Sequence, residues 1–480
     1  MEAFTEWLVM VKDMVWGVPL IVLILGCGLW LTVRVRLLQV FHLGKALRFM
    51  IQNEEEGHGE VTSFGALCTA LSATIGTGNI VGVASAICAG GPGALFWMEV
   101  AAFFGMATKY AEGLLAIKYR SVAEDGHVLG GPFYYIERGM GERRCLGISN
   151  RKWLARLFAV FGTLAGLLGI GTITQINGIT TAAQNFFDPN KNGLLFVLAK
   201  GTANETGINY TTVIAGLLVT LCAALVIIGG IKRIAKVSEV IVPFMAVLYV
   251  LCGLLILICN VDAIPGAFYQ IVVGAFAPKA VAGGIVGVTV KTAIQLGVAR
   301  GVFSNEAGLG SAPIAAAAAR TKDPVRQGLV TMTGTFIDTI IVCTMTGLSI
   351  VISGAWQPEL GLEGAEVTMY AFQNCLPFPA QVGSFLLMIC LVFFAFTTIL
   401  GWDYYSERCI EYLTNGKMSV VKAFRWLYIT AVFVGPYLTV KAVWTIADIF
   451  NALMAVPNII ALLALSVVIA HETRGRFAGR

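Results

Sequence analysis

The feature that most constrains this chain is a series of long segments without any charged residue. Residues 14–33 form the first of them, and the segments 61–98 and 367–402 are the longest. An α-helix needs about 20 apolar residues to span the hydrocarbon core of a bilayer, and each segment is long enough. Charged residues make up only 13% of the chain, against about 25% in soluble domains. We therefore predict an all-α polytopic membrane protein.

The same pattern predicts about eleven transmembrane helices in a single transmembrane domain, residues 1–480. The first helix, 14–37, has neither a basic leading segment nor a small-residue cleavage pattern, so we expect a retained helix and not a signal peptide. The other ten helices divide into two sets of five, 63–259 and 265–471. Because five is odd, the second set must begin on the opposite side of the bilayer. This arrangement is the inverted repeat of many secondary transporters.

The basic residues predict the orientation. If the amino terminus lies outside, most of the 33 lysines and arginines, Arg300 among them, fall on the inside together with the carboxyl terminus. An excess of lysine and arginine is typical of cytoplasmic loops, so we expect a multi-pass protein of the cell membrane with an external amino terminus. The net charge of +5 is spread over many loops. The expected surrounding is therefore the lipid bilayer, and no nucleic-acid partner is predicted.

Cysteine and histidine patterns argue against an enzyme. The eleven cysteines include no Cys-x-x-Cys pair and lie mostly in apolar segments, where they serve as small packing residues. The four histidines fall in loops or at helix ends, which disfavours zinc or Ser-His-Asp chemistry inside the membrane. We predict no resident cofactor.

The most specific signal is the segment 71–82, LSATIGTGNIVG. Its glycines, Gly76, Gly78 and Gly82, stand among β-branched and polar residues and disfavour a continuous helix. A helix that breaks in the middle of a bilayer exposes backbone groups, which must then line a cavity or bind a ligand. Alternatively, the glycines only let neighbouring helices pack closely.

The two sides of such a break would bind different ligands. Freed amides at the start of the outer half carry the positive end of the helix dipole and suit a substrate carboxylate. Freed carbonyls at the end of the inner half are hard oxygen donors and suit a sodium ion. The candidate substrate ligands here are Gly76, Thr77, Gly78 and Asn79. The candidate sodium ligands here are Ser72, Thr74 and Ile75.

Two stretches of the sequence resemble the sodium:alanine symporter family. The first is IGTGNIVGVA at 75–84, followed by GGPGALFW at 90–97, and the second is RGVFSNEAGLGSAP at 300–313. Hydropathy and helix count agree with that family over nearly the whole chain. The resemblance implies a LeuT-type fold, with two inverted five-helix repeats and one extra leading helix. It also implies cotransport of alanine or glycine with sodium.

In a LeuT-type fold, sodium usually meets two hydroxyls on the eighth core helix, and the resemblance assigns this role to Thr397 and Thr398. Phe394 would add a backbone carbonyl. Alternatively, both hydroxyls bond back to carbonyls of their own helix, which is a frequent arrangement. Neutral oxygens gathered at one point suit sodium better than magnesium or calcium, which prefer carboxylates.

Further polar residues lie inside predicted helices. Asp338 is costly to bury in a bilayer and is therefore expected to be functional. It would bind the substrate ammonium, support a cation site, or pair with Lys291. Gln175 and Asn177 lie on the third core helix, which lines the site in this fold. They are candidate substrate contacts, with hydrogen bonding between helices as the alternative.

The second set should contain a break that matches the first. Residues 282–289, AGGIVGVT, open this set, and we expect the break near Gly283 and Gly287. The motif Ser304-Asn305-Glu306 follows Arg300 on the side expected to be cytoplasmic. We interpret it as a gate, with a plain solvated loop as the alternative.

These features lead to the hypothesis of a sodium-coupled symporter that imports alanine or glycine by alternating access. A proton-coupled or exchange-type amino acid carrier of the same fold would need a titrating group, for which Asp338 is the candidate. An ion channel is disfavoured because breaks at the middle of the bilayer suit a discrete site. A membrane enzyme would need clustered histidines, cysteines or paired acids at depth, and the sequence has no such cluster.

Overall fold

The computed structural model describes residues 2–52, 54, 57–123, 126–140, 151–188, 194–197, 207–277, 289–438 and 440–477. Within these residues, nine helices are long and apolar enough to cross a membrane. A tenth crossing is a pair of helices, Ser63–Thr74 and Gly78–Gly90, that meet at an angle of 51°. The chain is therefore a polytopic helical membrane protein, as predicted.

The leading segment and the first set of spans follow one another along the chain. The leading helices are α1 (Glu2–Val15), α2 (Val18–Arg34), α3 (Leu38–Phe41) and α4 (Leu43–Ile51). The first set contains α5 (Ser63–Thr74), η1 (Gly78–Gly82), α6 (Val83–Gly90), α7 (Gly93–Lys118), α8 (Pro132–Tyr134), η2 (Tyr135–Gly139), α9 (Lys152–Leu168), α10 (Ile173–Phe187), α11 (Tyr210–Ile227) and α12 (Gly230–Cys259). The leading span, Glu6–Arg34, begins earlier than the predicted 14–37.

The rest of the chain continues with further helices. Its elements are η3 (Val261–Ala263), α13 (Ile264–Phe276), α15 (Val290–Asn305), α16 (Ala312–Ala317), α17 (Pro324–Thr335), η4 (Phe336–Cys343), α18 (Thr344–Ser353), η5 (Pro358–Leu360), α19 (Ala365–Cys375), α20 (Ala380–Leu413), α21 (Met418–Val434), η6 (Gly435–Tyr437), α22 (Val440–Ala464) and α23 (Ser466–Phe477). We assign the eleventh expected crossing to α15 and α16. The boundaries 63–259 and 265–471 of the two repeats stay a prediction.

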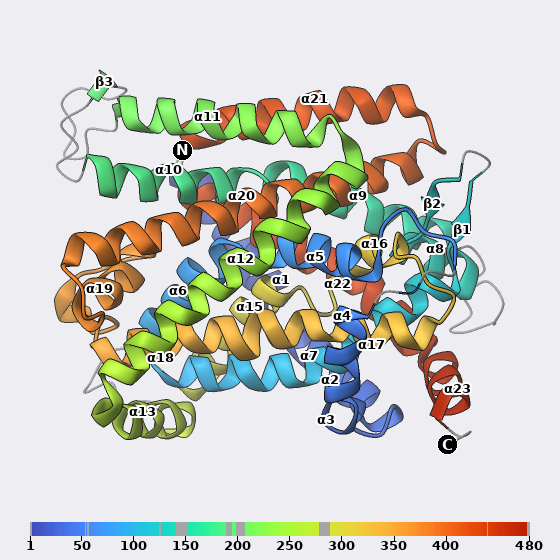
Figure 1. Ribbon diagram of the computed structural model, residues 1–480, viewed down its shortest axis with the longest axis horizontal. Helices are drawn as coiled ribbons and strands as arrows, with labels where there is room; N and C mark the ends of the chain where they lie inside the picture. Colours follow the sequence, from blue (N-terminus) through green and yellow to red (C-terminus); the bar gives the residue numbers. More distant parts are fainter. Residues whose placement is uncertain are drawn as a thin grey trace.

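Strands occur only in short hairpins among the described residues. β1 (Ser121–Val122) pairs with β2 (Val128–Leu129), and β3 (Leu194–Val197) pairs with β4 (Gly207–Asn209), both antiparallel. Figure 1 shows that the long helices run across the view, with β1, β2, α8 and α23 at its right-hand end and α13, α19 and β3 at its left-hand end. The two ends are therefore the two surfaces between which the helices cross.

Side-chain caps fix where several of these helices begin. Thr62 Oγ1 accepts a hydrogen bond from the Gly65 amide at 2.9 Å at the start of α5. At the start of α17, Asp323 caps two amides and Pro324 occupies the first helical position. Such caps satisfy amides that have no partner within the helix, and proline is tolerated at that position because it lacks an amide hydrogen.

Helix α7 packs against both α15 and α17, and small residues make this close packing possible. A Cβ atom on Gly297 of α15 would lie 2.2 Å from the carbonyl oxygen of Ala94 in α7. A Cβ on Gly328 of α17 would lie 2.7 Å from the carbonyl oxygen of Tyr110. Both distances are shorter than van der Waals contact. Glycine at these positions therefore sets how near α15 and α17 approach α7.

We predict that Gly297→Ala destabilises the folded protein. The added methyl group would force α15 away from the Ala94 carbonyl, and overpacking of this kind costs about 1–3 kcal/mol. Gly26→Ala is the matched control, because a Cβ there meets nothing within 4 Å. The midpoint of thermal unfolding in detergent should fall for Gly297→Ala and not for Gly26→Ala. Equal midpoints for Gly297→Ala and the natural protein would contradict the packing argument.

Candidate functional site

The first break lies between α5 and α6. Helix α5 ends at Thr74, and Ile75 is extended, with φ −76° and ψ 94°. The helical path resumes through the π-turn η1, Gly78–Gly82. Ile75 and Thr77 are both 0% exposed. The interruption thus falls where the glycines predicted it, and the backbone groups freed there need partners inside the protein.

The freed amides have side-chain partners. The Gly76 amide donates to Asn79 Oδ1 at 2.9 Å, and the Thr77 amide donates to Gln175 Oε1 at 3.1 Å. Gln175 Nε2 in turn donates to the Ile170 carbonyl at 2.8 Å, which fixes the orientation of the side-chain amide. Gln175 therefore reaches the break from α10. Its contact with a substrate stays a prediction.

Thr398 faces the break from α20. Its Oγ1 donates to the Phe394 carbonyl at 3.0 Å and also lies 3.3 Å from the Ile75 carbonyl. A Cβ on Gly76 would lie 2.5 Å from the same hydroxyl, so a side chain at position 76 would displace Thr398. Three of the candidate sodium ligands, Ile75, Phe394 and Thr398, are thus brought together.

The hydroxyls of the other candidate sodium ligands bond back to carbonyls of their own helices, which is the alternative given above for Thr397 and Thr398. Thr397 Oγ1 donates to carbonyls of its own helix at 3.0 Å and lies 3.5 Å from Met245 Sδ on α12. Ser72 and Thr74 also donate to carbonyls of their own helix. Ser72 nevertheless borders α20, since a Cβ on Gly401 would lie 2.8 Å from its Oγ. Binding of sodium by these three residues stays a prediction.

Asp338 joins the first span to α15. It lies in the π-helical segment η4 and is 0% exposed. Its Oδ1 accepts from Asn79 Nδ2 at 2.7 Å, and its Oδ2 accepts from Ser304 Oγ at 2.8 Å and Thr339 Oγ1 at 2.7 Å. The suggested pair with Lys291 is wrong, because Lys291 is exposed at the start of α15, about 20 Å along the helix from Ser304.

Not every predicted substrate contact reaches the break. Asn177 Nδ2 donates to the carbonyls of Ile173 and Gly435, both at 2.9 Å. Its amide therefore links α10 to η6, which is the alternative given for it. Gly283 and Gly287 lie outside the described residues.

A second break separates α15 from α16. Helix α15 ends at Asn305, and Glu306, Gly308 and Gly310 have positive φ angles of 56°, 88° and 82°. Glycine adopts such angles readily, which is why the chain can turn here. Ser304, Asn305 and Glu306 are each no more than 1% exposed. The alternative of a plain solvated loop is therefore wrong, and the interpretation of this motif as a gate stays a prediction.

Buried polar side chains stabilise the second break, and the sequence predicted no role for them. Glu112 Oε1 accepts from the amides of Gly308 at 3.2 Å and Gly310 at 3.1 Å, and from Asn458 Nδ2 at 2.7 Å. Trp402 Nε1 donates to Glu306 Oε1 at 2.8 Å. The available signal was the position of Glu112 inside the apolar span of α7, because an acid at such a depth is normally functional.

The sequence predicted a loop position for Arg300, but the structure places this residue in a helix. It belongs to α15 and makes two hydrogen bonds of 3.0 Å to the carboxylate of Asp448 on α22. Its guanidinium lies 5.5 Å from the ring centre of Phe303 and 5.8 Å from that of Trp444. The basic residues Arg320 and Arg326 follow the second break, whereas Arg300 precedes it. An ion pair thus joins α15 to α22 on one side of the breaks.

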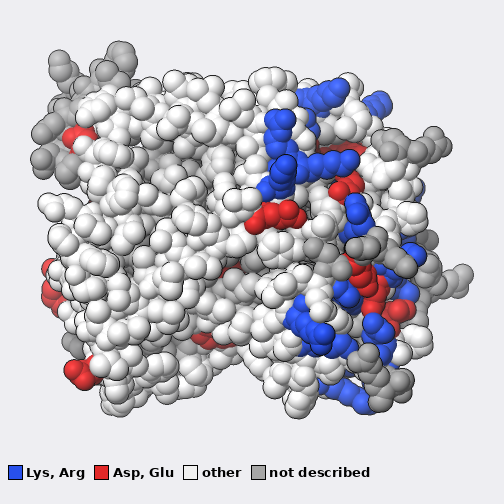
Figure 2. Space-filling view, viewed as in Figure 1, with Lys and Arg blue, Asp and Glu red and all other residues white. Residues whose placement is uncertain are grey.

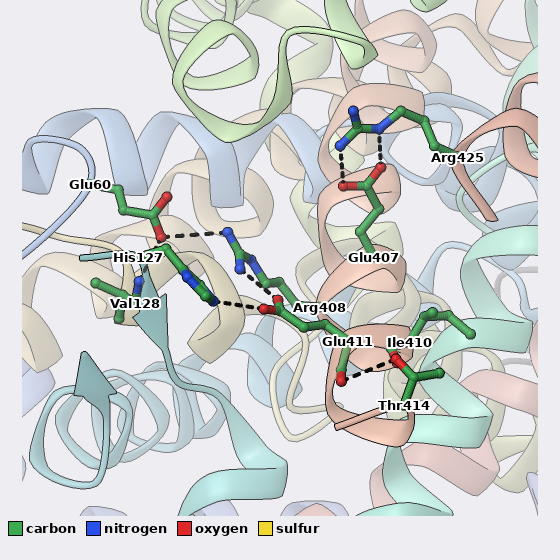
Figure 3. A network of polar contacts seen from close by, with 9 residues as sticks. All are labelled: Glu60, His127, Val128, Glu407, Arg408, Ile410, Glu411, Thr414 and Arg425. Carbon is green, nitrogen blue, oxygen red and sulfur yellow. Dashed lines mark hydrogen bonds and ion pairs between the residues drawn. The ribbon is translucent and has the colours of Figure 1, made fainter. Parts of the chain in front are cut away.

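A second ion network lies at the other ends of the broken helices (Figure 3). Arg408 on α20 bonds to Glu411 at 2.6 Å and lies 3.5 Å from Glu60, which precedes α5. Glu411 also bonds to His127 Nε2 at 2.7 Å. The Glu60 amide donates to the Ala318 carbonyl just after α16, at 2.9 Å. The network therefore ties the segments next to both broken helices to α20.

Around the two breaks, the described residues offer backbone amides, carbonyls, hydroxyls and side-chain amides. These groups can bind an ion and a small polar molecule between helices, and the paired ions on either side can block access to them. Polar groups supplied by broken helices inside the spans are typical of the binding sites of secondary transporters.

Comparison with known proteins identifies the family of the chain. The sodium:alanine symporter family model matches residues 1–477. An uncharacterized transporter of Haemophilus influenzae is 52% identical over 468 residues, or 97% of this chain and 95% of that protein. The sodium/alanine symporter AgcS of Methanococcus maripaludis is 46% identical over 473 residues, or 97% of this chain and 95% of that protein.

Among solved structures, MhsT in complex with L-phenylalanine matches with a TM-score of 0.54 at 12% identity. The match covers 88% of this chain and 100% of that chain, which supports the LeuT-type fold that the sequence predicted. The family model and the curated relatives match nearly the whole chain, and these relatives are transporters and not enzymes. The chain therefore belongs to the sodium:alanine symporter family.

Proposed function

We propose that this protein is a sodium-coupled symporter that imports a small neutral amino acid, alanine or glycine, by alternating access. The observation that carries the proposal is the meeting of Thr398 with the broken helix at Ile75. Their oxygens are 3.3 Å apart and come from two different spans. A cation bound between them would join the two helices, and this is the coupling that a symporter needs.

The spacing of these oxygens suits a sodium ion. Hard cations of this size bind oxygen at about 2.4 Å, so two ligands at a right angle lie about 3.4 Å apart. The Thr398 hydroxyl can donate its proton to the Phe394 carbonyl and turn its lone pairs toward the ion. We include Ser72, Thr74 and Thr397 as further ligands. Each carries a hydroxyl oxygen, and each lies close in the sequence to Ile75 or to Thr398.

For the substrate, we propose that its carboxylate binds the amides of the first break, from Gly76 to Asn79. Gln175 Oε1 already accepts the Thr77 amide, which supports an acceptor site at this position. Phe303 lies beside Gly78, since a Cβ on that glycine would lie 3.3 Å from the ring. Close walls of this kind leave room for a small side chain, which favours alanine or glycine.

Alternating access requires that each end of the site opens in turn. We propose that the Arg300–Asp448 pair closes the external end and that the Glu60–Arg408–Glu411–His127 network closes the cytoplasmic end. Lysine and arginine gather in the right-hand part of Figure 2, and this charge bias supports a cytoplasmic location of that end and of the carboxyl terminus. The amino terminus would then be external, and the protein would lie in the cell membrane.

We predict that Thr398→Ala weakens sodium coupling. Loss of the hydroxyl removes one sodium ligand, and a bond to a charged group contributes about 1.5–3 kcal/mol. The sodium concentration for half-maximal alanine uptake into proteoliposomes should therefore rise roughly 10- to 100-fold. Thr398→Ser keeps the oxygen and should stay near the natural protein.

Thr163→Ala is the matched control, because Thr163 Oγ1 also donates to a carbonyl of its own helix, in α9, and has no assigned contact with the break. Its uptake should depend on sodium as that of the natural protein does. Alanine uptake that continues without sodium and fails at high pH would instead favour a proton-coupled carrier.

One zwitterion with one sodium carries one net charge, so a potential of about 100 mV should add roughly 2.3 kcal/mol of driving force.

We also predict that Arg300 and Asp448 act as one unit in transport. Asp448→Asn leaves a partly buried arginine without its carboxylate and should lower alanine uptake more than the double variant Arg300→Gln/Asp448→Asn does. A coupling of about 0.5–3 kcal/mol is typical of residues in direct contact. The measurement is a double-mutant cycle on initial uptake rates at matched protein levels. Strictly additive effects would show that the pair has no shared role.

A further inference from the structure

A basic surface lies at one end of the molecule, away from the two breaks. It contains two cavities of about 550 and 380 Å³ where the leading segment meets the start of α17 and helix α23. The basic surface consists of Arg34, Arg36, Lys45, Arg48, Arg326, Arg474 and Arg476. None of the described residues that line these cavities is acidic. Such a concentration of one sign of charge attracts anions.

The protein itself neutralises only part of this charge. Arg326 lies 3.5 Å from Glu54, and Arg476 lies 2.9 Å from Asp323. Arg34, Arg36, Arg48 and Arg474 have no carboxylate partner among the residues that the structure describes. Burial and the charge of Lys45 lower the pKa of His42 below its usual range, which favours the neutral form of this side chain.

Exposed apolar side chains lie close in sequence to the residues of the basic surface. Phe41 is 72% exposed and Ile51 is 74% exposed. Phe49 and Phe477 lie inside the surface, with Lys45 Nζ 5.4 Å and 4.8 Å from their ring centres. The short helix α4 joins a span that ends at Arg34 to one that begins at Ser63, so it lies near the boundary of the apolar region. A fitting ligand has an anionic head beside an apolar body.

We propose that the basic surface binds the headgroup of an anionic phospholipid, such as phosphatidylglycerol, in the adjacent leaflet. The phosphate would bind the arginines that lack carboxylate partners, and the acyl chains would lie against the exposed side chains of Phe41 and Ile51. Arginine suits this role because its planar group can bind two phosphate oxygens at once. A soluble anion would gain nothing from the apolar border, which is why a lipid is the better fit.

The test compares lipid binding to two variants of equal charge. Arg48→Gln/Arg474→Gln removes two arginines from the two cavities. Lys417→Gln/Lys422→Gln removes two exposed lysines at the same end of the molecule but outside the cavities. The full-length protein in neutral detergent is titrated with phosphatidylglycerol or phosphatidylcholine, and bound lipid is counted by native mass spectrometry. Glycerol phosphate at millimolar concentration serves as a competitor without acyl chains.

We expect phosphatidylglycerol to bind more tightly than phosphatidylcholine to the natural protein. Each basic residue near an anionic headgroup contributes a factor of about five, so the double arginine variant should bind roughly 30-fold more weakly. The double lysine variant should stay within about twofold of the natural protein, because its lysines lie outside the cavities. Equal losses in both variants would indicate unspecific attraction and overturn the proposal. Displacement of the lipid by glycerol phosphate would assign the cavities to a soluble phosphate and also overturn it.

Discussion

The structure depends on one constraint, which is that a backbone amide or carbonyl inside a bilayer cannot stay without a hydrogen-bond partner. Two spans are broken where such groups become free. At the first break, Asn79 and Gln175 accept the amides of Gly76 and Thr77. At the second break, Glu112 accepts the amides of Gly308 and Gly310. Each break is stable because side chains replace the missing helical hydrogen bonds: Gln175 and Glu112 from other helices, and Asn79 from the broken span itself.

Because these side chains come from different spans, the two breaks are not independent. Asp338 accepts from Asn79 beside the first break and from Ser304 just before the second. A ligand that moves the first break therefore changes the bonds of the second through one carboxylate. If sodium orders the Ile75 carbonyl and the substrate orders the nearby amides, each ligand prepares part of the site of the other. Their affinities must then rise together, since coupling between sites is reciprocal.

The sequence predicted the class, the fold and the first break because each of these follows from local pattern. Gly76 and Gly78 interrupt an apolar segment, and the helix is broken beside them. The second break was expected near Gly283 and Gly287 because that segment is also rich in glycine. That segment lies outside the described residues, so the expectation stays a prediction. A break that the sequence did not predict lies around Gly308 and Gly310, where the backbone has positive φ angles and Glu112 accepts the freed amides. Such contacts between distant residues cannot be read from composition.

The charged residues show the same limit. Counting lysines and arginines by loop assigned Arg300 to the inside, because an arginine inside a span is normally excluded by its cost. The structure removes that cost locally, since Asp448 neutralises the guanidinium and Phe303 and Trp444 surround it. Four arginines of the basic surface have no such partner within the described residues, and they lie beside exposed apolar side chains: Arg34, Arg36, Arg48 and Arg474. The charge of Arg300 is therefore neutralised by the protein itself, whereas part of the charge on the basic surface is left for the surroundings to neutralise.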